Sequence, residues 1–419
     1  MRVAILTNHM EWNHGYSLTG IIQDQVDLLS QKGHNVILFV NEKFPWNSQV
    51  SGARLRRLPF SDLIDYTSKE DLTSEHLQLI ATIIPILKEE LQDVDVALTH
   101  DFLLTGWFLP YGLACLEASK DLPKTRWFHW IHSIPSGMKD WWTVQEWGSQ
   151  HRLVFPNETD KRRVAEQYRG WDDHVITIPH IKDPRTWFDF GEDSRRFINS
   201  YPNIMKADVV QILPASADRL KAKRVSDVIR IFSELKNQGK KVFLAVADQW
   251  ATTRVQRQSE EGYEVVARMF GLELGKEFVF TSTFEKPKYD QGIPRKMLRE
   301  LMLLSNLFVF PTEGESFGLV VPEAALCGAL LVLNDSLVMQ REVSGNNALF
   351  FPFGSYCINH HVDNPDQFFR DIASIVIRRM VLDQVIKAKT FCRQTYNMDT
   401  LYEKYYLPIF KESETWLKG

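Results

Sequence analysis

Two glutamates with a fixed separation are the residues best suited to chemistry in this chain of 419 residues. Glu315 and Glu323 are separated by seven residues. A carboxylate accepts hydrogen bonds without donating any, so it can hold the paired hydroxyl groups of a sugar or a ribose. Each residue alone has a simpler interpretation, because Glu315 fits a solvated loop and Glu323 fits the acidic first turn of a helix.

The segment around these glutamates predicts a binding loop for an anion. A strand is expected to end at Phe310, and Gly314 and Gly318 mark a loop after it. Pro322 suits a first helical turn, and Gly328 suits the position just past the last turn. Backbone N–H groups of the loop and of the helix start would then face one point, which favours a diphosphate.

Taken as a whole, this segment resembles the E-x7-E motif of the group 1 glycosyltransferases, which are retaining GT-B enzymes of the glycogen-synthase and bacterial mannosyltransferase type. Phe-Gly-Leu-Val from residue 317 and Pro-Glu-Ala-Ala-Leu-Cys-Gly from residue 322 are similar to the family's usual FGL and EAMACG. The resemblance implies that Glu315 is catalytic and that Glu323 binds the donor sugar nucleotide. It implies the same donor contact for Ser316, Phe317, Gly318 and Leu319.

A basic segment further upstream supplies the cations that the resemblance requires. Arg219 and Lys223 follow a predicted strand over 209–213, where the family places an Arg and a Lys that neutralise the leaving diphosphate. The match departs from the family in two ways: Asp218 replaces the usual glycine, and the gap between Arg and Lys is one residue short. Lys221 is therefore an alternative lysine, and a plain basic surface loop is the alternative to a site.

In the N-terminal half, the resemblance points to one histidine and one glycine. His132, at a strand end, matches the histidine that faces the donor sugar and is a catalytic candidate. Gly20 retains one glycine of the turn that opens the first helix near the acceptor and the donor phosphates, so it is a candidate donor contact. A hydrogen-bonded structural histidine is the alternative for His132. His129 and His132 would point to opposite faces of a strand, which argues against a metal site.

The remaining candidate contacts are less specific. Thr281 and Ser282 follow a strand where the family contacts the nucleotide base, and a polar loop is the alternative. Asp101, Trp141 and Trp142 are assigned to the acceptor side, where the tryptophans could stack on a sugar, a lipid or a nucleobase. The acceptor stays unidentified, and a glycan, a lipid, a metabolite and a modified nucleobase all remain open.

Composition limits the class of protein. The net charge of −4 does not favour a nucleic-acid partner, and four scattered cysteines form neither a disulfide framework nor a zinc pattern. The short apolar run at the N-terminus is not a signal peptide, and no stretch of about 18 apolar residues predicts a membrane span. A cytoplasmic protein is expected.

The elements that must position these residues follow an alternating strand and helix pattern, which is typical of doubly wound parallel α/β sheets. We predict an acceptor-side Rossmann-like domain over 1–185, a linker over 186–207 and a nucleotide-sugar-binding Rossmann-like domain over 208–395. The resemblance implies a GT-B fold with a central cleft, in which residues 396–419 form a helix that crosses back to the N-terminal domain.

The sequence therefore predicts a retaining glycosyltransferase that moves a hexose or pentose from a nucleoside-diphosphate sugar, most naturally a UDP- or GDP-sugar, to an acceptor hydroxyl. No cofactor and no metal are expected, since no DxD motif stands at a convincing strand end. A non-catalytic or epimerase-like sugar-nucleotide-binding protein on the same fold is the alternative.

Overall fold

The computed structural model describes residues 1–13, 15–59, 68–100, 108–133, 147–358 and 363–411, and its chain divides into two compact units. Unit 1 comprises Met1–Ile181 together with the chain from Met398 onward. Unit 2 comprises Lys182–Asn397. Each unit is an α/β structure in which all strand pairs are parallel, as the alternating pattern predicts.

Unit 1 is built on one seven-stranded sheet with the order β3-β2-β1-β4-β5-β6-β7. Its strands are β1 (Arg2–Leu6), β2 (Asn35–Asn41), β3 (Ala53–Leu58), β4 (Val96–His100), β5 (Arg126–Trp130), β6 (His151–Phe155) and β7 (Val175–Thr177). Its helices before unit 2 are α1 (Ser17–Gln31), η1 (Lys69–Asp71), α2 (Ser74–Leu91), α3 (Leu109–Ser119), α4 (Lys161–Gln167) and η3 (Asp172–His174). The strand order reverses direction between β1 and β4, and ligands of such sheets bind beyond the carboxyl ends at this point.

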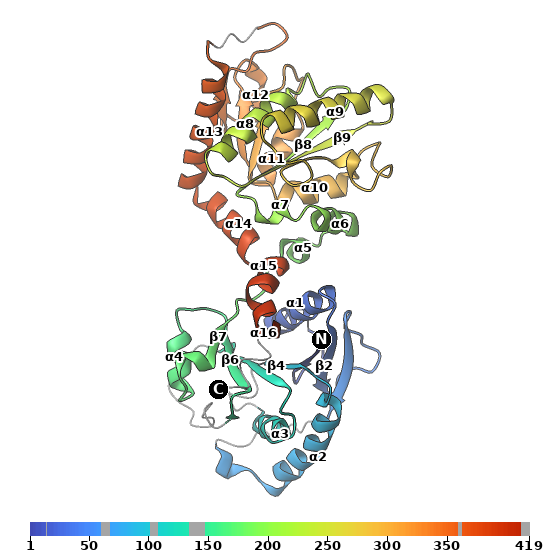
Figure 1. Ribbon diagram of the computed structural model, residues 1–419, viewed down its shortest axis with the longest axis vertical. Coiled ribbons are helices and arrows are strands. Elements are labelled where there is room, and N and C mark those ends of the chain that lie inside the picture. The colour runs from blue at the N-terminus through green and yellow to red at the C-terminus, as the bar shows by residue number, and fades with distance from the viewer. Residues whose placement is uncertain (14, 60–67, 101–107, 134–146, 359–362, 412–419) are drawn as a thin grey trace. The chain divides into compact units, whose positions relative to one another are not determined.

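Helices cover both faces of this sheet (Figure 1). Leu87 of α2 and Ala114 of α3 pack on one face, where they form a core with residues such as Trp127. Val26 of α1 packs on the other face, which it shares with Tyr406 from the end of the chain. The strands are therefore buried on both sides, which explains their nearly continuous apolar runs.

The end of the chain belongs to unit 1, as the resemblance to GT-B enzymes implies. It forms α15 (Met398–Leu401), the π-helical turn η5 (Tyr402–Tyr406) and α16 (Leu407–Lys411). The Nε2 of Gln25 on α1 donates to the hydroxyl of Tyr406 at 3.0 Å, and Lys32 forms an ion pair with Asp399 at 2.7 Å. Apolar packing and polar contacts thus both attach this segment to α1.

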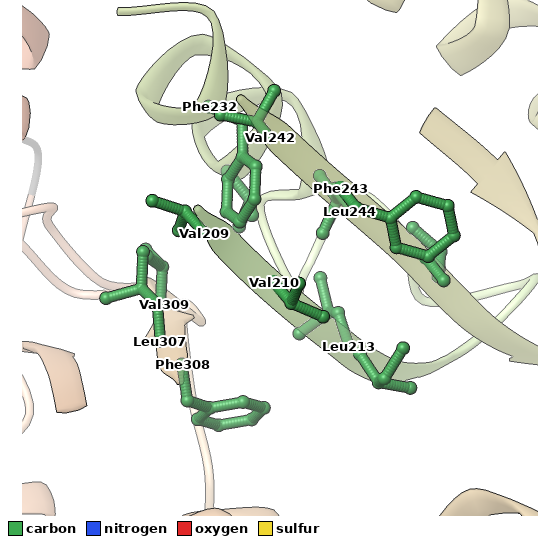
Figure 2. Packing of buried hydrophobic residues seen from close by; sticks show 14 of the residues in the cluster. Val209, Val210, Leu213, Phe232, Val242, Phe243, Leu244, Leu307, Phe308 and Val309 are labelled. Carbon is green, nitrogen blue, oxygen red and sulfur yellow. The ribbon is translucent and has the colours of Figure 1, made fainter. Parts of the chain in front are cut away.

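Unit 2 contains two three-stranded sheets, with the orders β10-β9-β8 and β11-β12-β13. The strands are β8 (Val209–Ser216), β9 (Val242–Gln249), β10 (Phe278–Phe280), β11 (Leu307–Phe310), β12 (Leu330–Asn334) and β13 (Leu349–Phe351). The helices are α5 (Pro184–Trp187), α6 (Glu192–Ser200), α7 (Asn203–Lys206), α8 (Val225–Asn237), α9 (Arg254–Met269), η4 (Thr281–Thr283), α10 (Arg295–Leu303), α11 (Val320–Leu326), α12 (Val338–Val343), α13 (Pro365–Leu382) and α14 (Gln384–Thr395). Apolar residues of β8, β9 and β11 share one core (Figure 2).

Side chains join β8 to β11 in place of a regular strand ladder. The buried amide of Gln211 on β8 donates from Nε2 to the carbonyl of Val309 at 2.9 Å and accepts from the Val309 N–H at 2.9 Å. The Oδ1 of Asn306 accepts from the N–H of Val210 in the same way at 2.9 Å. The two sheets therefore continue one another at β8 and β11, and the strand order reverses here as it does in unit 1.

Two segments differ from what the sequence patterns suggest. The predicted linker over 186–207 is part of unit 2, because residues 184–206 contain α5, α6 and α7. Phe197 and Ile198 of this segment lie in the core of unit 2. Arg54, Arg56 and Arg57, whose charges are typical of a solvated loop, lie on the edge strand β3, where Glu90 pairs with Arg56 at 2.8 Å. Charged side chains at a sheet edge obscure the strand pattern in the sequence.

Candidate functional site

An ion pair in unit 2 joins the loops that follow β8 and β11. The Nζ of Lys223 bonds to Oε1 of Glu315, although the two residues are 92 positions apart in the chain. Their side chains are 13% and 14% exposed, so the pair is largely shielded from water. The sequence nominated both residues, and the fold brings them together at the reversal point of the strand order.

Backbone contacts hold the two loops in this position. The carbonyl of Ala222 accepts from the N–H of Glu313 at 2.8 Å and from Oγ1 of Thr312 at 3.3 Å. A second ion pair joins Arg224 to Glu313 at 3.5 Å. The Nδ2 of Asn334 donates to the carbonyl of Thr312 at 2.9 Å, so the next strand also supports the loop. The position of the Lys223 and Glu315 side chains is therefore set by a rigid frame.

The surroundings of Lys223 favour the loss of its proton. Burial, and secondly the charge of Arg219, lower the pKa of Lys223 to about 8. Its ammonium group also lies 4.9 Å from the centre of the Phe310 ring. Arg219 and Lys221 are exposed, and no ion pair is found for either among the described residues. Of the two candidate lysines, Lys223 is the one placed beside Glu315.

Two glycines allow the loop after β11 to take its course. A Cβ at Gly314 would stand 2.8 Å from the ring of Tyr356, so this exposed ring would have to move to admit a side chain. Gly318 has φ +75°, a conformation that favours glycine, and its Cβ would point toward Glu315 and Phe310. The predicted loop with Gly314 and Gly318 is present, and the backbone conformation requires glycine at Gly318.

The other predicted donor contacts lie at the rim of this region. Ser316, Phe317 and Leu319 are exposed, and Glu323 on α11 pairs with Arg295 at 3.6 Å. Glu323 also lines a cavity of about 540 Å³ between α10 and α11. Since α11 has seven residues, its dipole contributes less than a long helix would.

Thr281 and Ser282 are buried against an acidic pair. The Oδ1 of Asp248 accepts from Oγ1 of Thr281 at 3.1 Å and from the N–H of Ser282 at 2.9 Å. Burial and the neighbouring Asp248 raise the pKa of Glu260, which accepts from Oγ of Ser282, to about 8. Both hydroxyl groups therefore serve internal hydrogen bonds in this structure.

In unit 1, histidines gather at the carboxyl ends of the strands. Nδ1 of His100, the last residue of β4, lies 3.0 Å from Nε2 of His132, which follows β5. The ring of His132 stacks on that of His180 at 5.2 Å, and Nε2 of His100 lies 2.8 Å from Oε1 of Gln25. Burial lowers the pKa of His132 to about 3, and lowers that of His9 beyond β1 to about 4. The edge is therefore polar but uncharged at neutral pH.

A second histidine pair lies deeper in the same sheet. His129 contacts Oγ1 of Thr99 at 2.8 Å and Nδ1 of His151 at 3.0 Å, while His151 contacts Oγ of Ser119 at 3.2 Å. The different partners of His129 and His132 agree with the opposite faces that strand alternation predicts. The sequence did not identify His151, His180 or Gln25 as members of these networks. Their positions near strand ends or in a helix turn carried no spacing signal.

Several predictions can be placed only in part. Asp101, Trp141 and Trp142 lie outside the described residues. Gly20 is exposed on α1, and a Cβ there would meet no atom within 4 Å. In the described part of the chain, no group of three or more His, Cys, Asp or Glu residues could hold a metal ion, and no helix is long and apolar enough to cross a membrane.

Comparison with known proteins identifies the second unit more clearly than the first. Residues 209–387 match the model of the family described as glycosyl transferases group 1. This match confirms the resemblance from β8 to the first turn of α14 and includes Arg219, Lys223, Glu315 and Glu323. No curated protein matches the sequence at a significant level.

Solved structures show similarity along nearly the whole chain, at low identity. A glycosyltransferase from Rickettsia africae is 11% identical, with 98% of each chain covered and a TM-score of 0.37. Anabaena Alr3699/HepE in complex with UDP is 12% identical, with 98% of this chain and 99% of that chain covered and a TM-score of 0.36. Similarity at this level does not assign a fold, which rests here on the strand order and the parallel pairing.

Proposed function

We propose that the protein is a retaining GT-B glycosyltransferase that uses a nucleoside-diphosphate sugar and transfers its hexose or pentose to an acceptor hydroxyl. The observation that carries this proposal is the Lys223–Glu315 pair, which lies inside the segment that matches the glycosyltransferase family. A largely shielded ion pair lies near an exposed arginine at the reversal point of the strand order. This arrangement suits a ligand that carries both hydroxyl groups and a diphosphate.

The donor would replace one partner of this pair. Lys223 and the exposed Arg219 are the cations available to a diphosphate, while Glu315 can accept hydrogen bonds from sugar hydroxyls. In the unliganded protein, Glu315 compensates the charge of Lys223 that burial disfavours. When the diphosphate takes over Lys223, Glu315 becomes free to bind the sugar. Glu323 is proposed to bind the ribose, and Thr281 and Ser282 mark the region of the base.

The proposed reaction places negative charge on the leaving diphosphate, where the cations of the site can stabilise it. The bond between the anomeric carbon and the oxygen of the β-phosphate breaks, and its electron pair stays on the diphosphate. Fixed cations stabilise this charge most when water is excluded. The acceptor oxygen forms the new bond on the same face of the sugar, and its proton passes to the leaving phosphate. The sugar therefore keeps its anomeric configuration.

The donor is proposed to be a UDP- or GDP-sugar, and the acceptor remains a hydroxyl of unidentified class. The net charge of −4 gives no support to a nucleic-acid acceptor. The four cysteines are free, which agrees with the proposal of a cytoplasmic protein.

A thermal-shift panel of UDP-, GDP-, ADP- and TDP-sugars tests this function. A donor at 100 times its Kd contributes about 2.7 kcal/mol to stability, which corresponds to a rise in Tm of several degrees. The wild-type protein is expected to respond to one nucleotide, and Lys223→Ala is expected to lose the response. Binding to none of the four would overturn the proposal. Binding with neither transfer nor hydrolysis over a broad acceptor panel would favour a non-catalytic binding protein.

A further inference from the structure

The loop that follows β13 lies against the loop that carries Glu315. In the β13 loop, the N–H of Tyr356 donates to the carbonyl of Glu313 at 3.3 Å. The N–H of Glu313 in turn donates to the carbonyl of Ala222, the residue before Lys223, at 2.8 Å. The backbone of Glu313 therefore joins the segment that carries Tyr356 to the segment that carries Lys223, and both segments belong to unit 2.

Hydrogen bonds hold the backbone around Tyr356 in place. The Oδ1 of the buried Asn334 accepts from the N–H of Phe353 at 3.1 Å. The Oγ of Ser355 accepts from the N–H of Ile358 at 3.1 Å, and the N–H of Ser355 donates to the carbonyl of Ile358 at 2.8 Å. Tyr356 thus lies within a closed turn that is anchored to the end of β12, so its position is set by the backbone.

The ring of Tyr356 meets the Glu315 loop by one edge only. A Cβ at Gly314 would stand 2.8 Å from Cε2 and 2.9 Å from Cδ2 of Tyr356, and no other ring atom lies within 4 Å of that point. Both faces of the ring are left open by this contact, and the residue is 68% exposed. Among the described residues, the side chain has no hydrogen bond, stacked ring or cation as a partner.

A fixed aromatic ring next to a carboxylate suits a sugar. Gly314 and Glu315 are consecutive, so their Cα atoms lie about 3.8 Å apart. A ligand that donates a hydroxyl group to Glu315 therefore has its own ring within reach of Tyr356. Hydroxyl groups at the rim of a sugar bind a carboxylate, and the C–H groups on its faces pack against an aromatic ring.

We infer that Tyr356 is a specificity-determining residue whose ring packs against the donor sugar held by Glu315, and that this sugar is a neutral hexose. This inference rests on the proposed function and names the class of sugar that the same site binds. The C6 hydroxymethyl group of a hexose carries a CH2 that a pentose lacks, and the ring of Tyr356 can remove that CH2 from water.

The charges of this loop disfavour an acidic sugar. In the proposed complex the diphosphate takes Lys223, so the carboxylate of Glu315 loses its cation. The carboxylate of Glu313 is two residues away and pairs with Arg224 at 3.5 Å. A uronic acid would bring a third carboxylate to this point, and like charges placed together weaken binding.

Calorimetric titration of the full-length protein with three matched donors tests the inference without an acceptor. UDP-glucose, UDP-xylose and UDP-glucuronate differ only at C6, and UDP-galactose, UDP-arabinose and UDP-galacturonate form a second such set. In one set, the hexose is expected to bind about tenfold more tightly than the pentose and the uronic acid. A protein that responds to another nucleotide in the thermal-shift panel is tested with the matched hexose, pentose and uronic acid of that nucleotide.

Variants of Tyr356 assign this preference to its ring. Tyr356→Ala should reduce the preference for the hexose over the pentose to about twofold and leave the Kd of UDP itself unchanged. Tyr356→Phe should keep the full preference, because the ring and not the hydroxyl group makes the contact. Phe391→Ala is the matched control, since Phe391 is also an exposed aromatic residue of unit 2 but lies on α14. It should change neither the preference nor the Kd of UDP.

Gly314→Ala tests the position of the ring independently. Its new Cβ would displace the Tyr356 ring, so Gly314→Ala alone should also weaken the preference for the hexose. In the Tyr356→Ala background the same substitution should have no further effect, because the ring that it displaces is absent. Independent, additive effects of the two substitutions would contradict the contact.

The outcomes separate this inference from the function on which it rests. Equal binding of hexose and pentose, tighter binding of the uronic acid, or a preference that Tyr356→Ala preserves would each overturn the inference while nucleotide binding stays intact. Binding to no nucleoside diphosphate at all would overturn the proposed function, and the inference with it.

Discussion

The two units place opposite chemistry at the same position of the same kind of sheet. In unit 1, the reversal point between β1 and β4 is lined by histidines that burial keeps neutral. In unit 2, the reversal point between β8 and β11 holds the ion pair of Lys223 and Glu315, with Arg224 and Glu313 beside it. A shared fold therefore dictates where a site forms, and the side chains that end each strand dictate what it binds.

Under the proposed function, the charged edge in unit 2 is the one suited to the diphosphate of the donor. Hydroxyl groups are neutral and need oriented donors and acceptors, whereas a diphosphate needs fixed positive charge. The comparison predicts that variants in unit 2 affect reaction rate through charge and that variants in unit 1 act through orientation.

The largest effect is expected from the ion pair itself. Glu315→Gln and Lys223→Ala should each lower kcat by about 10²- to 10³-fold or more, because both remove charge from the reacting centre. Glu313→Gln is the matched control, since Glu313 is two residues away and also forms an ion pair, in its case with Arg224. Steady-state kinetics with circular dichroism as a folding check measures this. Equal losses for Glu313→Gln and Glu315→Gln would remove the special role of Glu315.

The pH dependence of kcat/KM should come from unit 2 alone. With the pKa of Lys223 at about 8, the ammonium group loses its proton as the pH rises through 8, and kcat/KM is expected to fall by about tenfold per pH unit above that value. Lys223→Arg should move this fall above pH 10, since an arginine stays charged. No inflection is expected near pH 6.5, because burial lowers the pKa of His132 to about 3. An inflection near pH 6.5 that is absent in His132→Gln would contradict the conclusion that the histidines at the strand ends of unit 1 are uncharged.

The stabilities of the two units should change with pH in opposite directions. Buried histidines of unit 1, such as His151 with a pKa of about 3, bind fewer protons when folded, so unit 1 should lose stability as the pH falls below 6.5. Glu260 in unit 2, with a pKa of about 8, binds more protons when folded, so unit 2 should lose stability as the pH rises from 4.5 to 8.

Calorimetry between pH 5 and 8 can test this as two transitions whose Tm values shift by a few degrees per pH unit in opposite senses. Glu260→Gln should flatten the dependence of one transition, and His151→Gln should flatten that of the other. Parallel shifts of both transitions would show that the electrostatic contrast between the units does not control their folding.

The smallest effect is expected from a helical glycine. Gly20 on α1 and Gly262 on α9 both have open space where a Cβ would stand. Replacing either by alanine should stabilise its unit by about 0.5–1 kcal/mol, because alanine favours the helix. If the donor contacts Gly20, as the resemblance to the family implies, Gly20→Ala should also raise the donor KM severalfold, while Gly262→Ala should not. An unchanged KM would restrict donor binding to unit 2.

The fold and the candidate loops of unit 2 can be predicted from the sequence for a physical reason. Strand ends, Gly318 and the spacing from Glu315 to Glu323 are local patterns, so they are readable without the structure. The fold adds that Lys223, and not the exposed Lys221, pairs with Glu315. Short-range patterns therefore indicate the loops, and three-dimensional packing selects the side chain.

The unit 1 network could not be derived in this way. Gln25, His100 and Tyr406 come from α1, β4 and the end of the chain, and Tyr406 is 381 residues from Gln25. Buried polar partners at such distances leave no period or spacing in the sequence. The edge strand β3 was missed for a related reason, since Arg54, Arg56 and Arg57 resemble a surface loop until Glu90 and the neighbouring strand are seen.

The Gln211 amide between β8 and β11 has a consequence for hydrogen exchange. The N–H of Val309 lies in the middle of unit 2, yet its protection depends on one side chain and not on a neighbouring backbone. Deuterium uptake at Val309 therefore reports how often the two three-stranded sheets separate at the point from which the Lys223 and Glu315 loops extend. We expect ligand binding to those loops to slow exchange at Val309 before exchange elsewhere in unit 2 changes. Exchange at this amide would therefore show whether the site is occupied.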